Sequence, residues 1–87
     1  DSPALFAAMR TGLAEDDRPV LRRAAHTMKS TSSSLGALPL AARCRAIEAE
    51  ALDGDATALA AGIDAAEAEY ARASAALRAQ VEDPPRP

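Results

Sequence analysis

Apolar side chains recur at helical spacing in four stretches of the chain, separated by short segments that contain proline, glycine or acidic residues. The first stretch follows Pro3, which suits the first turn of a helix, and carries Leu5, Phe6, Met9 and Leu13. Intervals of three and four residues place side chains on one face of an α-helix. This stretch therefore predicts a first helix with one apolar face.

A second helix is predicted to begin after the acidic segment 15–17, where an aspartate can cap the helix and Pro19 fits its first turn. Gly36 follows the last periodic position, and a glycine in the left-handed conformation commonly ends a helix there. We expect this helix to bury a stripe formed by Leu21, Ala25, Met28, Ser32 and Leu35.

Two further helices are predicted, one starting at Pro39 and one after the turn at residues 53–55, whose aspartates can cap the last helix. The third helix has one face formed by Leu40, Cys44, Ile47 and Ala51. In the fourth helix, intervals of four and three continue through Leu59, Ile63, Ala66, Tyr70, Ala73, Leu77 and Val81. Such spacing is typical of a helix packed antiparallel in a bundle.

Composition agrees with an all-helical chain. The 87 residues are 48% hydrophobic, much of this is alanine, and valine and isoleucine are scarce. We therefore expect an all-α, up-down antiparallel four-helix bundle over residues 1–82 and a proline-rich tail or linker at residues 83–87. The absence of a starting methionine and the proline-rich end favour a segment of a longer protein.

Charge changes the picture, because it is unevenly distributed. Residues 1–45 carry seven basic and four acidic groups, whereas residues 46–87 carry three basic and nine acidic groups. No acidic residue lies between Arg18 and Arg45. The net charge of −3 argues against non-specific nucleic-acid binding, and the local basic zone favours an acidic or phosphorylated partner.

Several classes of protein find no support in the sequence. No apolar run approaches the length of a membrane span, and a single cysteine, Cys44, forms no intrachain disulfide. One histidine and one cysteine make no metal-ligand cluster, and there is no glycine-rich phosphate loop for ATP. Cys44 and Tyr70 are interpreted as core residues, and Glu48 and Glu50 as solvated surface charges.

The stretch HTMKSTSSSLGA, residues 26–37, holds the only histidine of the chain. On a helical wheel His26 lies roughly 140° from the apolar stripe, so we expect it to face solvent. It is either a surface histidine without a role or a nucleophilic imidazole whose neighbouring cations stabilise an attached anion. Small side chains beside it would let another protein approach. The neighbouring residues are Arg22, Arg23, Lys29, Ser30 and Ser33.

These residues carry a resemblance. Residues 26–37 resemble the motif H-x-L-K-G-S-S-x-x-L-G-A of histidine-containing phosphotransfer (HPt) domains. The likeness continues in the third helix, where Leu40, Ala41, Cys44 and the pair Ile47 and Glu48 match the family's L-A-x-x-C-x-x-L-E run. It covers most of residues 13–77 and implies a helical bundle that carries a phosphoryl group.

The resemblance implies a histidine phosphocarrier of a multistep two-component phosphorelay, which is not itself an enzyme. His26 would accept a phosphoryl group from a receiver-domain aspartate and pass it to another receiver. Lys29 and Ser30 would stabilise that group, and the docking residues would be Arg22, Arg23, Ser33 and Gly36. The receiver, including one of a hybrid histidine kinase, would supply Mg²⁺, so the chain needs no cofactor or metal of its own. We expect a cytoplasmic monomer that binds neither nucleic acid nor membrane.

One departure from the family motif keeps an alternative open. The family usually has glycine four residues after the histidine, and this chain has Ser30. The alternative is a helical bundle that binds a receiver or another signalling partner without phosphotransfer. A dimerising histidine-kinase helix pair fits less well, because Thr27 follows His26 where those helices usually have an acidic residue.

Overall fold

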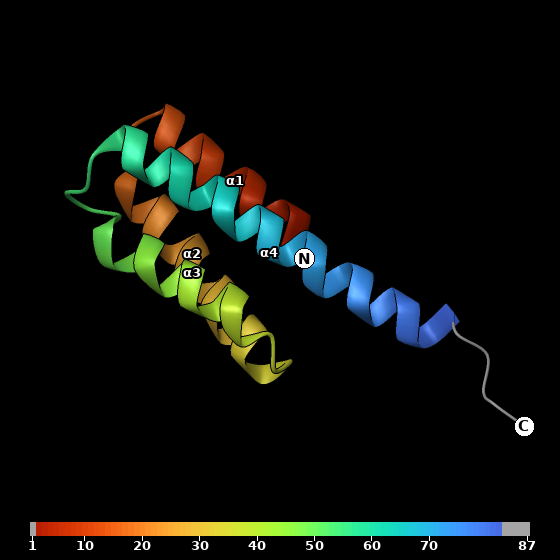
Figure 1. The fold of residues 1–87 in the computed structure, drawn as a ribbon. Helices are drawn as coiled ribbons and strands as arrows, with labels where there is room; N and C mark the ends of the chain where they lie inside the picture. The colour runs from red at the N-terminus through yellow and green to blue at the C-terminus, as the bar shows by residue number, and fades with distance from the viewer. Residues whose placement is uncertain (1, 83–87) are drawn as a thin grey trace, which may run out of the picture.

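The computed structural model describes residues 2–82, which form four α-helices and no strand. The helices are α1 (Ser2–Ala14), α2 (Arg18–Ser34), α3 (Leu38–Glu50) and α4 (Ala56–Glu82). Helix pairs α1 and α2, α2 and α3, α3 and α4, and α1 and α4 pack against each other (Figure 1). The all-α prediction is therefore confirmed for these residues, whereas the tail predicted at residues 83–87 lies outside them.

The ends of α2 follow the sequence prediction. The carboxylate of Asp17 accepts a hydrogen bond from the backbone N–H of Val20 at 3.4 Å, and proline occupies the first turn. After α2, Gly36 adopts a φ of +77°, a conformation that glycine enters without the steric strain of a side chain. The N–H groups of Gly36 and Ala37 then bond to the carbonyls of Ser33 and Ser32, so the helix stops and the chain reverses into α3.

A second reversal, between α3 and α4, is fixed by a local cap and by a residue from the start of α2. The carboxylate of Asp55 caps α4 by accepting from the N–H of Ala58 at 3.1 Å, as predicted. The guanidinium of Arg18 donates to the carbonyls of Ala51 at 3.0 Å and Gly54 at 2.9 Å. These carbonyls lack helical partners, so the start of α2 satisfies the end of α3.

The core lies where the four helices face one another. It consists of Phe6, Met9, Leu21, Ala24, Ala25, Met28, Leu40, Cys44, Ile47, Ala51, Leu59, Ile63 and Ala66. Ser32 is also buried, and its hydroxyl donates to the carbonyl of Met28 at 2.7 Å, so it leaves no unsatisfied donor. The predicted apolar face of α3 is confirmed in full, including Cys44.

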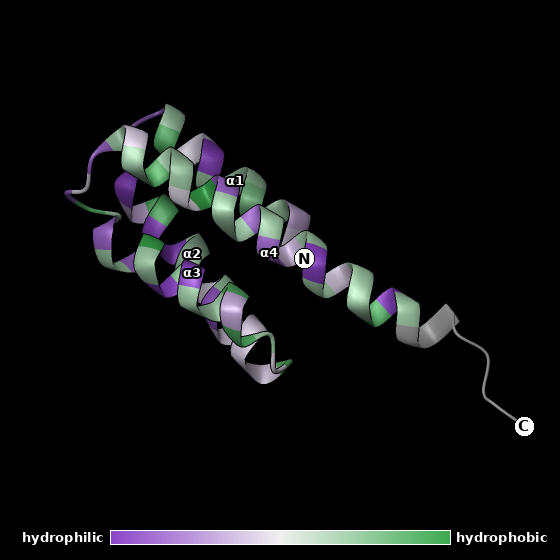
Figure 2. Ribbon diagram, in the orientation of Figure 1, coloured by the Kyte–Doolittle hydropathy of each residue, from purple (hydrophilic) through white to green (hydrophobic). Residues whose placement is uncertain are grey.

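Two predicted core positions are wrong. Leu35 is 73% exposed, because α2 ends at Ser34 and the residue that follows turns away from the stripe. Leu77 is 57% exposed, because α4 continues beyond the level at which α1 begins and loses that packing partner (Figure 1). Hydrophobic positions nevertheless continue along this part of α4 (Figure 2). The spacing of the fourth helix thus predicts its periodicity correctly but overestimates how much of it is covered.

None of the helices within residues 2–82 has the length and apolar character needed to span a lipid bilayer.

Candidate functional site

His26 lies in the middle of α2 and points away from the core. Its side chain is 59% exposed, as the helical wheel predicts, whereas Ala25 and Met28 beside it are fully buried. Ala25 and Met28 anchor the helix, so the imidazole is carried on a fixed backbone rather than on a loop. The imidazole is therefore accessible from solvent.

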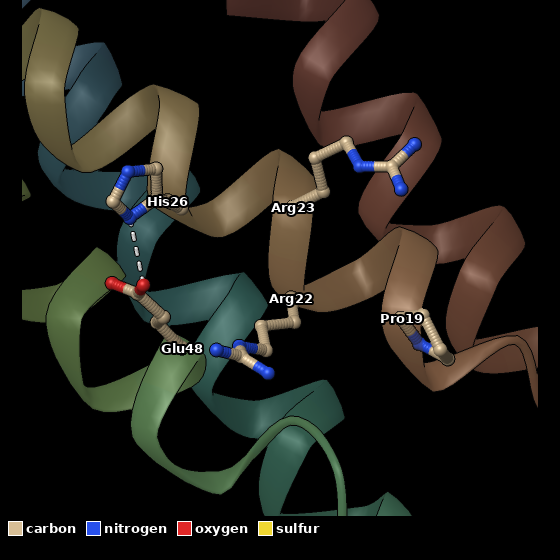
Figure 3. Close-up of a pocket in the computed structure, with 5 residues that line it drawn as sticks. All are labelled: Pro19, Arg22, Arg23, His26 and Glu48. Atoms are coloured by element: carbon tan, nitrogen blue, oxygen red, sulfur yellow. Dashed lines mark hydrogen bonds and ion pairs between the residues drawn. The ribbon is translucent and has the colours of Figure 1, made fainter.

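The other ring nitrogen is held by a carboxylate from the neighbouring helix. Nδ1 of His26 lies 2.7 Å from Oε2 of Glu48 on α3 (Figure 3). An ionised carboxylate can only accept a hydrogen bond, so Nδ1 carries the proton in this contact. In the neutral imidazole the lone pair then resides on Nε2. The contact therefore selects the tautomer whose nucleophilic nitrogen is Nε2.

Glu48 also binds the lysine of the motif. Nζ of Lys29 lies 2.7 Å from Oε1 of Glu48, so the two carboxylate oxygens serve two different residues of α2. The hydrogen bond from Lys29, followed by that from His26, lowers the pKa of Glu48 below its ordinary value. Glu48 is consequently ionised at neutral pH, which the contact with Nδ1 requires.

These contacts overturn two expectations from the sequence. Glu48 is not a freely solvated charge, because its side chain is only 19% exposed and is bonded on both oxygens. The ring of His26 is also not surrounded by cations alone, since its nearest charged partner is a carboxylate. Glu50, by contrast, is exposed, as expected.

A shallow hollow of about 360 Å³ borders this pair and is lined by Pro19, Arg22, Arg23, His26 and Glu48. Figure 3 shows Arg22 extending toward the α3 side and Arg23 toward α1. Both arginines are exposed. The hollow can thus receive an anionic group next to the imidazole, with a guanidinium on either side of α2.

The remaining predicted site residues follow His26 along α2. Ser30 and Ser33 are exposed, and Gly36 is exposed at the turn after the helix. Ser30 lies one helical turn beyond His26, so its small side chain borders the approach to the ring. The structure therefore brings His26 and Lys29 together on Glu48, with Arg22 on the α3 side and Arg23 directed toward α1. Gly36 lies well over two turns from the imidazole.

Sequence reasoning missed Glu48 because it lies on another helix. The signal that could have found it is the turn at Gly36, since His26 and Glu48 are about equally far from that residue along the chain. In a helical hairpin such positions lie at the same level. Glu48 is moreover one turn from the buried Cys44 and next to Ile47, which places it at the edge of the core facing α2.

The fold and the site together define a class: a helical bundle with one exposed histidine that is hydrogen-bonded to a carboxylate of the neighbouring helix. The family model described as Hpt domain matches residues 1–82, so the chain belongs to the Hpt domain family. Hpt domains are phosphotransfer carriers, not kinases, in phosphorelays, and they interact with receiver domains. No match was found among the curated proteins or among the solved structures.

Proposed function

We propose that His26 is the phosphoacceptor of this domain and that it takes the phosphoryl group on Nε2. One observation carries the proposal: Nδ1 is bound to Glu48 at 2.7 Å while the imidazole is 59% exposed. A solvent-facing histidine without a role has no need of a bonded carboxylate on its inner nitrogen. The contact leaves a single nucleophilic atom, and that atom faces the partner.

The transfer needs few groups from this chain. The lone pair of Nε2 attacks phosphorus in the aspartyl phosphate of a receiver, forming an N–P bond. The P–O bond to the aspartate breaks, and its electron pair returns to the aspartate carboxylate. Nε2 carries no proton, so no base is required. The proton on Nδ1 stays bonded to the ring, and the Glu48 carboxylate that accepts from it offsets the positive charge that the ring gains. The receiver would supply its own Mg²⁺, and the reverse reaction would pass the group to a second receiver.

The cations near His26 have distinct proposed roles. Lys29 would stabilise the phosphoryl oxygens, with Ser30 adding a hydroxyl at the edge of the site. Lys29 is 27% exposed and bound to Glu48, so it can turn an N–H toward the phosphoryl group while it keeps that partner. Arg22, Arg23, Ser33 and Gly36 would contact the receiver surface.

The rest of the proposed description concerns the whole chain. Packing of consecutive helices, with α4 against α1, supports an up-down antiparallel bundle as the scaffold. All residues of the site come from α2 and α3 of one chain, which supports a monomer as the working unit. Exchange with receiver domains, including those of hybrid kinases, would place the chain in the cytoplasm.

The test is incubation of the 87-residue chain with phosphorylated receiver domains of the source organism. Acid-labile, alkali-stable phosphate should appear on the chain, and His26→Gln should abolish it. The variant should keep its helical signal and a stability within about 0.5 kcal/mol, because the residue is on the surface. Receivers that bind the chain but transfer nothing would favour the alternative of a binding module. Phosphate retained by the variant would show that another residue is the acceptor.

A further inference from the structure

A groove between α2 and α3 continues from the site, on the α3 side of His26. A hollow of about 520 Å³ there is lined by Arg22, Lys29, Arg45, Glu48, Ala49, Leu52 and Asp53. It shares Arg22 and Glu48 with the hollow beside His26. A partner that reaches the imidazole from this side therefore also covers residues of α3 that are not among the docking residues expected from the sequence.

The two flanks of α3 have different surroundings. Arg45, Glu48 and Leu52, at intervals of three and four, line the groove toward α2. Ala46 and Glu50 instead line a separate hollow formed with α4. Arg43 is exposed and lies one turn before Ala46, so it belongs to the α4 side. The chain thus provides a matched arginine on each flank of one helix.

The groove is positively charged despite the two acidic residues that line it. The charge of Glu48 is balanced by its ion pair with Lys29, which leaves Arg22 and Arg45 against Asp53. Among the side chains of residues 2–79, no carboxylate lies within ion-pair distance of Arg22 or Arg45. Both guanidinium groups are therefore free to bind acidic side chains of another protein, and no local acidic residue has to be displaced first.

The α1 side of α2 has fewer unpaired basic groups than the α3 side. α1 contributes one arginine, Arg10, and its guanidinium is already ion-paired with Asp64 and Glu67 of α4. Arg23 is the basic group that points that way (Figure 3). A specific interface buries about 800 Å² on each partner, far more than the exposed surface of His26 alone. Because the unpaired arginines Arg22 and Arg45 lie on the α3 side, we expect the remainder of the interface to cover α3.

Leu52 adds an apolar contact to this surface. Its side chain is 50% exposed and lines the same hollow as Arg22 and Arg45. A single exposed leucine is ordinary on a protein surface, but an apolar side chain beside unpaired cations is the arrangement of an interface anchor with a polar rim. An apolar side chain of the partner would pack on Leu52 while its carboxylates bind the two arginines.

We propose that the partner docks over the α2–α3 groove, using Arg22, Arg45 and Leu52, and that it is a receiver domain with acidic side chains around an apolar one. The identity of the partner rests on the proposed function, whereas the location of the surface rests on the charges and exposure just described. The surface extends the docking residues named from the sequence onto a second helix.

The experiment measures binding of the receiver domains of the source organism to the His26→Gln chain, in which no transfer can occur. Arg45→Glu and Leu52→Ser should each raise the dissociation constant of the receiver complex at least about tenfold, a loss of about 1.4 kcal/mol in binding free energy. The matched controls are Arg43→Glu, on the other flank of α3, and Leu38→Ser, a leucine that is 64% exposed at the α2–α3 turn. Both should stay within about twofold of the parent.

Salt and fold provide two further readouts. The loss caused by Arg45→Glu should shrink as ionic strength rises, whereas that of Leu52→Ser should not. Circular dichroism should show all four variants folded, because the four side chains are exposed, and Arg45→Ala and Leu52→Ala provide milder replacements.

The outcomes separate this surface from the proposed function. Transfer to His26 combined with unchanged binding of Arg45→Glu and Leu52→Ser would overturn the surface and leave the phosphoacceptor intact. Tight binding that these variants lose, without any transfer to the parent chain, would support the surface and overturn the proposed function. If no receiver binds the chain at all, the proposed partner is wrong.

Discussion

Nδ1 of His26 and Oε2 of Glu48 lie 2.7 Å apart, although the residues belong to different helices. The contact fixes which nitrogen of the imidazole carries a proton and which faces outward. It also joins the histidine of α2 to a residue of α3 that a motif search centred on the histidine does not reach.

Replacing Glu48 by glutamine should allow the neutral imidazole of His26 to adopt both tautomers. The amide has nearly the same shape but can either accept or donate, so it no longer requires a proton on Nδ1. Nitrogen-15 NMR of the imidazole should show one neutral tautomer in the parent and a mixture in Glu48→Gln. Phosphoryl uptake should fall by about tenfold, in the range of a lost positioning contact. Glu50→Gln, on an exposed part of the same helix, is the control and should change neither signal.

The lowered pKa of Glu48 predicts a dependence of stability on pH. A carboxylate whose pKa is lower in the folded state contributes stability above its unfolded pKa, and this is lost as pH falls through the folded value. The melting temperature of the parent should therefore decline more than that of Glu48→Gln below the ordinary glutamate value of 4.5. The effect should be modest, because the pair is partly exposed. If the melting temperatures of the two proteins fall equally with pH throughout this range, the ionised Glu48 does not stabilise the fold.

Lys29→Ala should slow transfer or shorten the lifetime of phosphohistidine more than it weakens receiver binding. The ammonium group lies near the place where negative charge accumulates, and it also holds Glu48 at 2.7 Å. Removal should cost at least about tenfold in rate, which is less than the roughly 100-fold or more of an enclosed charge-stabilising donor, because Lys29 is 27% exposed. Arg78→Ala, an exposed cation at the far part of α4, serves as control. Transfer at the parent rate would contradict the phosphate-stabilising role of Lys29 and leave only its ion pair with Glu48.

Ser30 tests how a partner approaches the imidazole. Ser30→Gly restores the residue usual in the family, at a cost of roughly 0.5 kcal/mol in helix propensity. If the side chain only crowds the site, this variant transfers faster although it melts lower. If the hydroxyl helps to hold the phosphoryl group, Ser30→Gly and Ser30→Ala both transfer more slowly. Ser30→Leu should block docking in either case, and transfer at the parent rate by this variant would place the receiver on a different face.

Arg18→Ala should destabilise the fold without touching the site. Its guanidinium donates to two carbonyls at the end of α3, at 3.0 and 2.9 Å, and its side chain is only 19% exposed. Loss of these charged hydrogen bonds should lower the free energy of unfolding by about 1.5–3 kcal/mol in urea titrations. Arg43→Ala, an exposed residue, is the control. An equal effect of the two substitutions would mean that water replaces Arg18 at the turn.

The hydrophobic pattern predicts more of the fold than of the site. Helix ends at Asp17 and Gly36 follow from local chemistry, and both are confirmed. Leu77 could not be assigned from its spacing, because periodicity describes one helix and exposure depends on whether another helix covers it. Glu48 was not predicted as a site residue for a related reason. The sequence of α3 alone indicates a solvated charge, and the contacts with His26 and Lys29 form only when α2 packs beside α3.

The reversal at Gly36 has a consequence for when the chain is reactive. A slip of α3 along α2 by one residue would move Glu48 by about 1.5 Å, enough to break a contact of 2.7 Å with His26. An unfolded or misaligned chain still contains the histidine, but its imidazole is no longer restricted to one tautomer. Phosphoryl uptake should therefore depend on the register of α3 against α2 and not only on the presence of His26.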